Sequence, residues 1–326
     1  MDHVAGHAVR AHHDSGREPL TPGGLVRRGL APIALAFAAG CATGEPPDAE
    51  GADRPGWTLV WADEFDGPAI DPESWTAVVM PDPFNDELQY YTDRLDGERG
   101  ANAWIEDGAL VIEARREDYE HRRYTSARLN TRGKREFRYG RFEARIRQPG
   151  EVGLWPAFWL LGANIDEVGW PRCGEIDVME GKGRLPRWTS GAIHRGPDPE
   201  RDSVTWAEYR LEEGSFHDEW HVFAVEWTED RIRWLVDGIE YSAVEEKPGD
   251  GSLYWPFDEG HPFYLILNLA VGGWFDRPHV PPEDVTPQWL VVYSGRVFGA
   301  AGAAYRARPA PGRAGRPSAR SAPRPP

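Results

Sequence analysis

The chain has 326 residues, of which 40% are hydrophobic and 12% aromatic, enough for one large folded domain or two modest ones. The formal net charge of −16 argues against nucleic acid or an anionic membrane surface as a partner. All 15 tryptophans lie between Trp57 and Trp289, so the folded part spans roughly 240 residues, the size of one all-β sandwich.

The first 56 residues show features of export rather than of a folded core. Arg27 and Arg28 precede an apolar run over residues 30–39, and small residues follow directly before Cys41. This order is typical of a secretory signal, and a cysteine at this place resembles a bacterial lipobox, which predicts lipidation of Cys41. The apolar run is too short for a stable transmembrane helix. We therefore expect an N-terminal extension and lipoprotein-type signal over 1–41, a linker over 42–56, and a protein of the cell envelope or one that is secreted.

Residues 1–24 match no export signal, although four histidines occur among the first 13 residues. Our hypothesis is that translation starts later than Met1.

Strand patterns with short turns dominate the folded part, and helical periodicity is almost absent. Asp107-Gly108 divides residues 104–114 into a hairpin, because Asp-Gly favours a tight two-residue turn. Residues 263–271 are almost entirely apolar, which predicts a central strand. Further strands are predicted over 139–147, 223–227 and 231–238, the last two as a second hairpin. The pattern is that of an all-β sandwich.

Three carboxylates fall within one predicted strand: Glu175, Asp177 and Glu180. Side chains alternate along a strand, so Glu175 and Asp177 share a face and Glu180 comes one residue late. A β-bulge near Val178 or Met179 would bring Glu180 to the same face. Three acids on one face repel each other and raise at least one pKa, which is typical of a glycosidase site.

The approach to this strand carries a family resemblance. The run Leu154–Gly162, reading LWPAFWLLG, and the segment 170–174 resemble glycoside hydrolase family 16, within it the laminarinase-like endo-β-1,3-glucanases. Supporting segments lie at 61–67, 85–92, 124–131 and 267–273, and the resemblance covers about residues 57–298. It implies a β-jelly roll of two antiparallel sheets, with a substrate cleft on the concave face.

The resemblance also implies the roles of the acids. Glu175 is expected to be the nucleophile, Glu180 the general acid/base and Asp177 an assisting residue. Retaining hydrolysis needs the two working carboxyls about 5–5.5 Å apart. The expected reaction is endo-hydrolysis of β-1,3-glucan or mixed β-1,3/1,4-glucan by double displacement, without a cofactor. Like charges are expected to raise the pKa of Glu180.

The resemblance places further residues in the cleft. Aromatic faces stack on sugar rings, and polar side chains hydrogen-bond hydroxyl groups. We expect Trp155 and Trp170 to be the leading sugar platforms. The expected substrate-binding residues are Trp155, Trp170, Trp159, Trp274, Asn85, Arg128 and His194.

The end of the chain departs from the family pattern. Family members end in a strand with an acid that commonly contributes to a structural calcium site, together with a carbonyl matching that of Gly108. Residues 290–298 lack this acid and their spacing is off by one, so calcium is in doubt and the metal content stays open. A reading-frame change near the end of the gene is one hypothesis; if the frame is real, we expect this strand to pair poorly. Residues 299–326, rich in Arg, Pro and Ala, are predicted to be disordered.

Other classes remain to be weighed. A non-catalytic β-glucan-binding protein typically loses one or both glutamates, and both are present here. A transglycosylase or a hydrolase of an agar- or carrageenan-type galactan is a further alternative, since Lys182, Arg184 and Arg187 follow the acidic strand. A metal site built from the three acids lacks histidines at helical spacing. The expected partner is a β-glucan polysaccharide, the expected state is a monomer, and a membrane contact is expected only through a lipid on Cys41.

Overall fold

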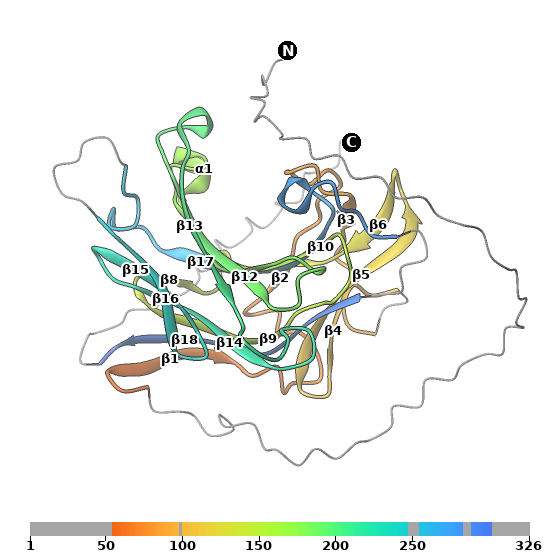
Figure 1. The fold of residues 1–326 in the computed structure, drawn as a ribbon, viewed down its shortest axis with the longest axis horizontal. Helices are drawn as coiled ribbons and strands as arrows, with labels where there is room; N and C mark the ends of the chain where they lie inside the picture. The colour runs from red at the N-terminus through yellow and green to blue at the C-terminus, as the bar shows by residue number, and fades with distance from the viewer. Residues whose placement is uncertain (1–53, 98–99, 247–253, 283–287, 302–326) are drawn as a thin grey trace, which may run out of the picture. The chain divides into compact units, whose positions relative to one another are not determined.

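The computed structural model describes residues 54–97, 100–246, 254–282 and 288–301. Cys41, the signal, most of the linker and the tail from residue 302 lie outside the described residues. The described part forms two β-sheets stacked face to face around one hydrophobic core (Figure 1). No helix within these ranges is long and apolar enough to cross a membrane.

The larger sheet has ten strands in the order β16-β15-β14-β9-β18-β5-β6-β3, with β1 paired to β18 and β4 paired to β5. All its pairs are antiparallel except β3 with β6. Its strands are β1 Trp57–Asp63, β3 Gln89–Tyr91, β4 Ala103–Glu106, β5 Ala109–Tyr119, β6 Arg122–Ser126, β9 Gly140–Arg147, β14 His221–Trp227, β15 Arg231–Val236, β16 Ile239–Glu245 and β18 Gln288–Ala300.

The smaller sheet is entirely antiparallel, in the order β13-β12-β11-β10-β17-β7-β2, with β8 beside β17. Its strands are β2 Thr76–Ala77, β7 Arg128–Asn130, β8 Glu136–Phe137, β10 Leu154–Gly162, β11 Glu175–Gly181, β12 Trp188–Arg195, β13 Ser203–Arg210 and β17 Phe263–Val271. Helical segments in the described part are single turns: α1 Ile165–Val168, η1 Pro199–Arg201 and η2 Trp274–Asp276.

The strands predicted from the sequence are confirmed. The first hairpin turns at Asp107 and Gly108, whose φ angles are both positive, as the tight turn between β4 and β5 requires. β14 and β15 form the second hairpin. β17 is buried along its whole length and lies between β10 and β7, which explains its continuous apolar sequence.

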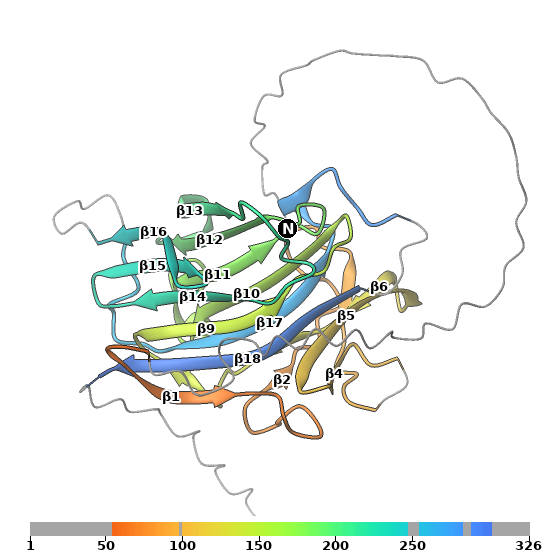
Figure 2. The ribbon, with the colours of Figure 1, turned by 60° about the horizontal axis from the view of Figure 1, so that its bottom comes forward.

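The expectation that the last strand pairs poorly is wrong. β18 pairs with β9 on one side and with β1 and β5 on the other, and Figure 2 shows it running through the larger sheet beside β1. A β-bulge accommodates the shifted spacing. Val292 pairs with Ile146 and Ser294 with Arg145, so Tyr293 is the extra residue. The strand continues to Ala300, opposite Trp57, two residues beyond the predicted end of the folded part.

Candidate active site

A β-bulge in β11 places the three acids on one face of the smaller sheet. Asp177 pairs with Ala192 and Glu180 with Ser190 on β12, so two residues of β11, Val178 and Met179, share one position opposite. Both of these side chains and Ile176 are buried in the core between the sheets. The predicted bulge is therefore confirmed, and the acids project from the opposite face.

The acids line a cleft of about 1080 Å³ over the smaller sheet. All the residues that the sequence placed in the cleft also line it: Asn85, Arg128, Trp155, Trp159, Trp170, Glu175, Asp177, Glu180, His194 and Trp274. They come from β7, β10, β11, β12, from η2, from the segment before β3 and from the loop between α1 and β11. The structure thus brings together side chains that are far apart in the sequence.

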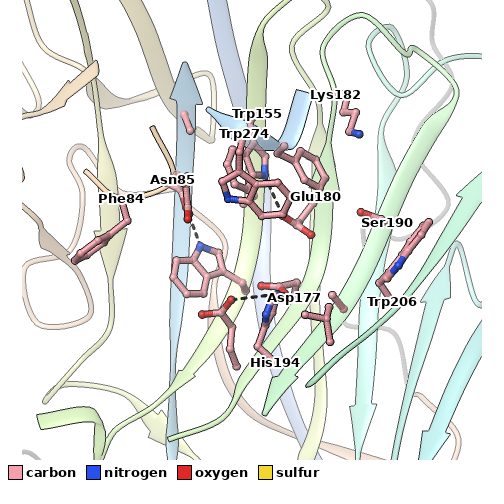
Figure 3. Close-up of a pocket in the computed structure, with 18 of the residues that line it drawn as sticks. Phe84, Asn85, Trp155, Asp177, Glu180, Lys182, Ser190, His194, Trp206 and Trp274 are labelled. Carbon is pink, nitrogen blue, oxygen red and sulfur yellow. Dashed lines mark hydrogen bonds and ion pairs between the residues drawn. The ribbon is translucent and has the colours of Figure 1, made fainter. Parts of the chain in front are cut away.

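Each of the two outer acids accepts a hydrogen bond from a tryptophan. The indole of Trp155 donates to Glu180 over 3.0 Å, and the indole of Trp170 donates to Glu175 over 3.1 Å. Figure 3 shows Trp155 and Trp274 next to Glu180. Trp155 is only 8% exposed and its ring is stacked on Phe275, with the centroids 4.6 Å apart. Its geometry is that of a residue that orients Glu180, whereas a sugar platform needs an open ring face.

His194 lies between the acids and a carboxylate that the sequence analysis missed. Its Nε2 is 3.7 Å from Glu175 and 3.6 Å from Asp177, as Figure 3 shows for Asp177. Its Nδ1 is 2.9 Å from Asp202, which precedes β13. Burial alone would lower the pKa of His194, but the hydrogen bond to Asp202 and the charges of Glu175 and Asp177 outweigh it and raise the pKa to about 10. His194 is therefore an imidazolium at neutral pH.

The three acids themselves have raised pKa values. Burial raises the pKa of Glu180 to about 7, against the opposing effects of His194 and the Trp155 hydrogen bond. Burial also raises the pKa of Glu175, opposed by His194, Arg128 and Trp170. The pKa of Asp177 lies well above its usual range, because the residue is buried beside both glutamates. The predicted rise for Glu180 is confirmed, with burial rather than like charge as the larger cause.

A second set of hydrogen bonds holds the neighbouring strands. Trp159 donates to Asn268 over 2.8 Å, Asn268 donates to the Tyr91 hydroxyl, and that hydroxyl donates to Glu87. The guanidinium of Arg128 lies over the Trp159 ring at 4.7 Å. These contacts leave Trp159 half-buried with its ring covered by Arg128.

The most exposed aromatic side chains of the cleft were only partly foreseen. Trp274 is 51% exposed, Trp206 on β13 is 62% exposed and Phe84 is 73% exposed. Figure 3 shows Phe84 and Trp206 on opposite sides of the acids. A signal for Trp206 was available, since polar Ser203 and Thr205 alternate with apolar Val204 and Trp206 as in a strand with two different faces. Phe84 follows no periodic pattern that would have indicated it.

One group of described residues has the spacing of metal ligands. Atoms of Glu175, Asp177 and His194 all lie within 4.8 Å of one another. The histidine that seemed to be lacking comes from the neighbouring strand, where it pairs with Glu175. In this structure Nδ1 of His194 is hydrogen-bonded to Asp202 and its Nε2 faces Glu175 and Asp177, so the four side chains form an ion-pair cluster.

Calcium, which the sequence left in doubt, finds no carboxylate on the final strand. Residues 290–298 carry no Asp or Glu, and among the described residues the group with metal-ligand spacing lies in the cleft and not at Gly108.

Comparisons with known proteins agree with this geometry. The model of glycosyl hydrolases family 16 matches residues 96–289, more than half of the chain. The beta-glucanase of Rhodothermus marinus is 42% identical over 257 residues, which cover 74% of this chain and 87% of that protein.

Two solved structures superpose on the fold. The catalytic domain of an endo-1,3-beta-glucanase (laminarinase) from Thermotoga petrophila is 42% identical, with a TM-score of 0.67 over 75% of this chain and 98% of that one. A mutant of SCLam, a non-specific endo-beta-1,3(4)-glucanase co-crystallised with 1,3-beta-D-cellotriosyl-glucose, is 32% identical, with a TM-score of 0.67 over 74% and 95% of the two chains. The fold, the cleft and these relatives lead to one conclusion: the chain belongs to glycosyl hydrolases family 16, as a glycoside hydrolase similar to its laminarinases.

Proposed function

We propose that the protein hydrolyses internal bonds of β-1,3-glucan, and of mixed β-1,3/1,4-glucan, with retention of configuration. The observation that carries the proposal is the pair of differently held carboxyls on one cleft face. Burial raises the pKa of Glu180 to about 7, so this group holds a proton to donate near neutral pH. Burial raises the pKa of Glu175 as well, but the His194 imidazolium 3.7 Å away and the hydrogen bond from Trp170 oppose this rise and favour its ionised form.

The geometry supports a two-step reaction. Glu175 attacks the anomeric carbon while Glu180 gives its proton to the leaving glycosidic oxygen. Glu180 then takes a proton from a water molecule whose oxygen attacks the anomeric carbon, and the bond from that carbon to Glu175 breaks and releases the sugar. Asp177 accompanies Glu175 on the same face, and its Oδ2 has no hydrogen-bond partner in the protein, so it can share a proton with the nucleophile.

The exposed aromatics support binding of a sugar chain along the cleft. Trp206 and Phe84 lie on opposite sides of the acids and Trp274 lies next to Glu180, so pyranose rings can stack on both sides of the cleaved bond. Asn85 and Arg128 supply donors for hydroxyl groups. The related SCLam mutant, co-crystallised with 1,3-beta-D-cellotriosyl-glucose, holds an oligosaccharide at its active site, which supports binding of a β-glucan chain in this cleft.

The cations near the acids favour a neutral substrate over a sulfated galactan. Arg184 is paired with Asp276 at 2.9 Å, and Arg187 donates to the carbonyl of Leu211. The ammonium of Lys182 lies over the rings of Trp188 and Phe275, at 4.9 and 4.4 Å from the ring centroids. The charge of Arg184 is thus neutralised by Asp276, which reduces the positive charge available to sulfate groups.

The proposal also covers the oligomeric state, the cofactors and the location of the protein. We propose that the protein acts as a monomer, needs neither a cofactor nor calcium, and binds no nucleic acid. We further propose that it is exported and that a lipid on Cys41 anchors it in the bacterial envelope, or that it is secreted if the lipid is not added. The basic and apolar segment before Cys41 supports this part.

The test is product analysis on laminarin, mixed-linkage glucan and agarose. We expect laminarin to be cut to short oligosaccharides with the β-anomer released first. Glu175→Gln and Glu180→Gln should each lower kcat by at least about 10²-fold. Glu240→Gln, on strand β16 of the larger sheet, is the matched control and should leave kcat unchanged. Activity on agarose or carrageenan without activity on any β-glucan would overturn the substrate proposal.

A further inference from the structure

Asp202 is a cleft residue with no part in the reaction described so far. It ends the short η1 turn and precedes β13, and its side chain is 15% exposed. Its Oδ2 accepts a hydrogen bond from Nδ1 of His194 over 2.9 Å. The other ring nitrogen of His194 faces Glu175 and Asp177 at 3.7 and 3.6 Å.

The imidazole of His194 is therefore enclosed by carboxylates on two sides. An ionised carboxylate only accepts hydrogen bonds, so Asp202 requires a proton on Nδ1. Glu175 and Asp177 favour a proton on Nε2 for the same reason. The arrangement favours the doubly protonated ring, which carries one positive charge between the nucleophile and Asp202.

Few other charges act on this array. Glu180 lies on the same strand as Glu175 and Asp177, and the positive charge of His194 also lowers its pKa. Arg128 on β7 acts on Glu175 from the other side and lowers its pKa as well. The ring of Trp170 packs against the imidazole with the centroids 5.6 Å apart and brings no charge.

We propose that Asp202 is a positioning residue of the hydrolysis, holding the His194 imidazolium against Glu175 and Asp177 so that the nucleophile stays ionised and oriented. The inference rests on the proposed function of the site and adds to it a group that does not touch the reacting atoms. Without Asp202, one of the two interactions that keep both ring nitrogens protonated is gone. Neutral His194 then leaves two buried carboxylates without their countercharge.

The chain contains a matched pair outside the cleft. Nδ1 of His221 lies 2.7 Å from Asp237, and its Nε2 faces Glu219 at 3.9 Å. Neither His221 nor Asp237 lines the cleft. Asp237→Asn therefore removes the same kind of contact without touching the acids.

The experiment compares the full-length wild type with Asp202→Asn, Asp202→Glu and Asp237→Asn. The pKa of the His194 imidazole is measured by NMR, with the signal assigned by its loss in His194→Gln, and kcat/KM on laminarin is measured at pH 5 and pH 8. In Asp202→Asn we expect the pKa of His194 to fall by about three units, a thousandfold change in proton affinity, so that the ring is largely neutral at pH 8. We expect kcat/KM to fall at least about tenfold at pH 8 and about threefold or less at pH 5, because His194 stays protonated at pH 5 in both proteins.

The controls separate positioning from a general structural role. Asp202→Glu keeps the charge and should recover part of the kcat/KM lost at pH 8. Asp237→Asn should change neither the pKa of His194 nor the ratio of kcat/KM at pH 8 to kcat/KM at pH 5. An unchanged His194 titration in Asp202→Asn, or an activity loss equal at both pH values, would overturn the proposal. The NMR titration does not require turnover. If the wild type is inactive on laminarin but Asp202→Asn lowers the pKa of His194 as expected, the result contradicts the proposed substrate and not the role of Asp202.

Discussion

Asp177 is the acid whose surroundings conflict most with its charge. It is 5% exposed, lies beside two glutamates, and its Oδ2 has no hydrogen-bond partner. Because its pKa in the folded state lies well above that in the unfolded chain, protonation of Asp177 favours the fold. That contribution is present at low pH and is lost as the pH rises through the folded-state pKa. Ionised Asp177 therefore destabilises the protein once the pH exceeds its folded-state pKa.

We predict that Asp177→Asn raises the melting temperature at pH 8 and lowers kcat. Removing a buried charge of this kind should contribute about 1 kcal/mol, or about 2–4 °C in a domain of this size. The gain should shrink at pH 4, where wild-type Asp177 takes up a proton. Calorimetry at both pH values checks this, and a lower melting temperature at pH 8 would contradict it.

At the residue scale the sequence predicted which side chains meet but not how they are oriented. The identity and spacing of Glu175, Asp177 and Glu180 were sufficient to predict a shared face, because alternation and one bulge are local properties. The partnership of His194 with Asp202 depends on the path of the chain between β12 and β13, which has no sequence signature. Likewise, nothing in the sequence shows that Phe275 covers the face of Trp155.

At the element scale the bulge in β11 is held from the other sheet. A bulge disrupts local ladder pairing, and here the carbonyl of Asp177 accepts a hydrogen bond from the indole of Trp234 on β15 over 2.8 Å. Trp234 reaches this point because Gly191 lies opposite the bulge. A Cβ on Gly191 would lie 2.3 Å from the Trp234 ring. The sequence predicted the bulge, but the glycine and the tryptophan that hold it became visible only with both sheets in place.

We predict that deleting Met179 damages catalysis more than replacing it. The deletion makes β11 regular and keeps Glu180 opposite Ser190 on the acid face, but it removes the local bend and twist of the bulge and so re-aims the Glu180 side chain. Misplacement by even about 1 Å can cost about 10²-fold, so kcat/KM should fall at least that much. Met179→Leu conserves the buried volume and should cost less than about 1.5 kcal/mol with near-normal kcat/KM. Equal activity of the two variants on laminarin would show that the bulge does not set the spacing of the acids.

At the scale of the whole molecule the sandwich followed from strand periodicity, whereas the order of strands did not. Alternation and turn signals identify strands, but pairing between β18 and β9 joins segments more than a hundred residues apart, and no local pattern specifies it. Long-range pairing also explains why β18 forms although its sequence departs from the family pattern. Val292 and Val297 are fully buried, so its apolar side chains secure the strand although its polar pattern departs from the family.

The export proposal makes a prediction for the complete chain. Expressed in a bacterium supplied with labelled palmitate, the protein should incorporate label and fractionate with membranes, since lipid on Cys41 provides the anchor. Cys41→Ser should take up no label and leave the membrane fraction, with unchanged kcat on laminarin. A wild-type protein without label would exclude the lipid anchor, and one retained in the cytoplasm would exclude export.

The place of β18 beside β1 has a consequence for how the molecule is made. The larger sheet stays split until its final strand arrives, because β9, β5 and β1 meet only through that strand. A growing polypeptide therefore cannot complete this half of the domain until residues 288–300 have left the ribosome. Until then the strand edges that β18 covers stay unpaired, and the nascent protein can be bound there by a chaperone.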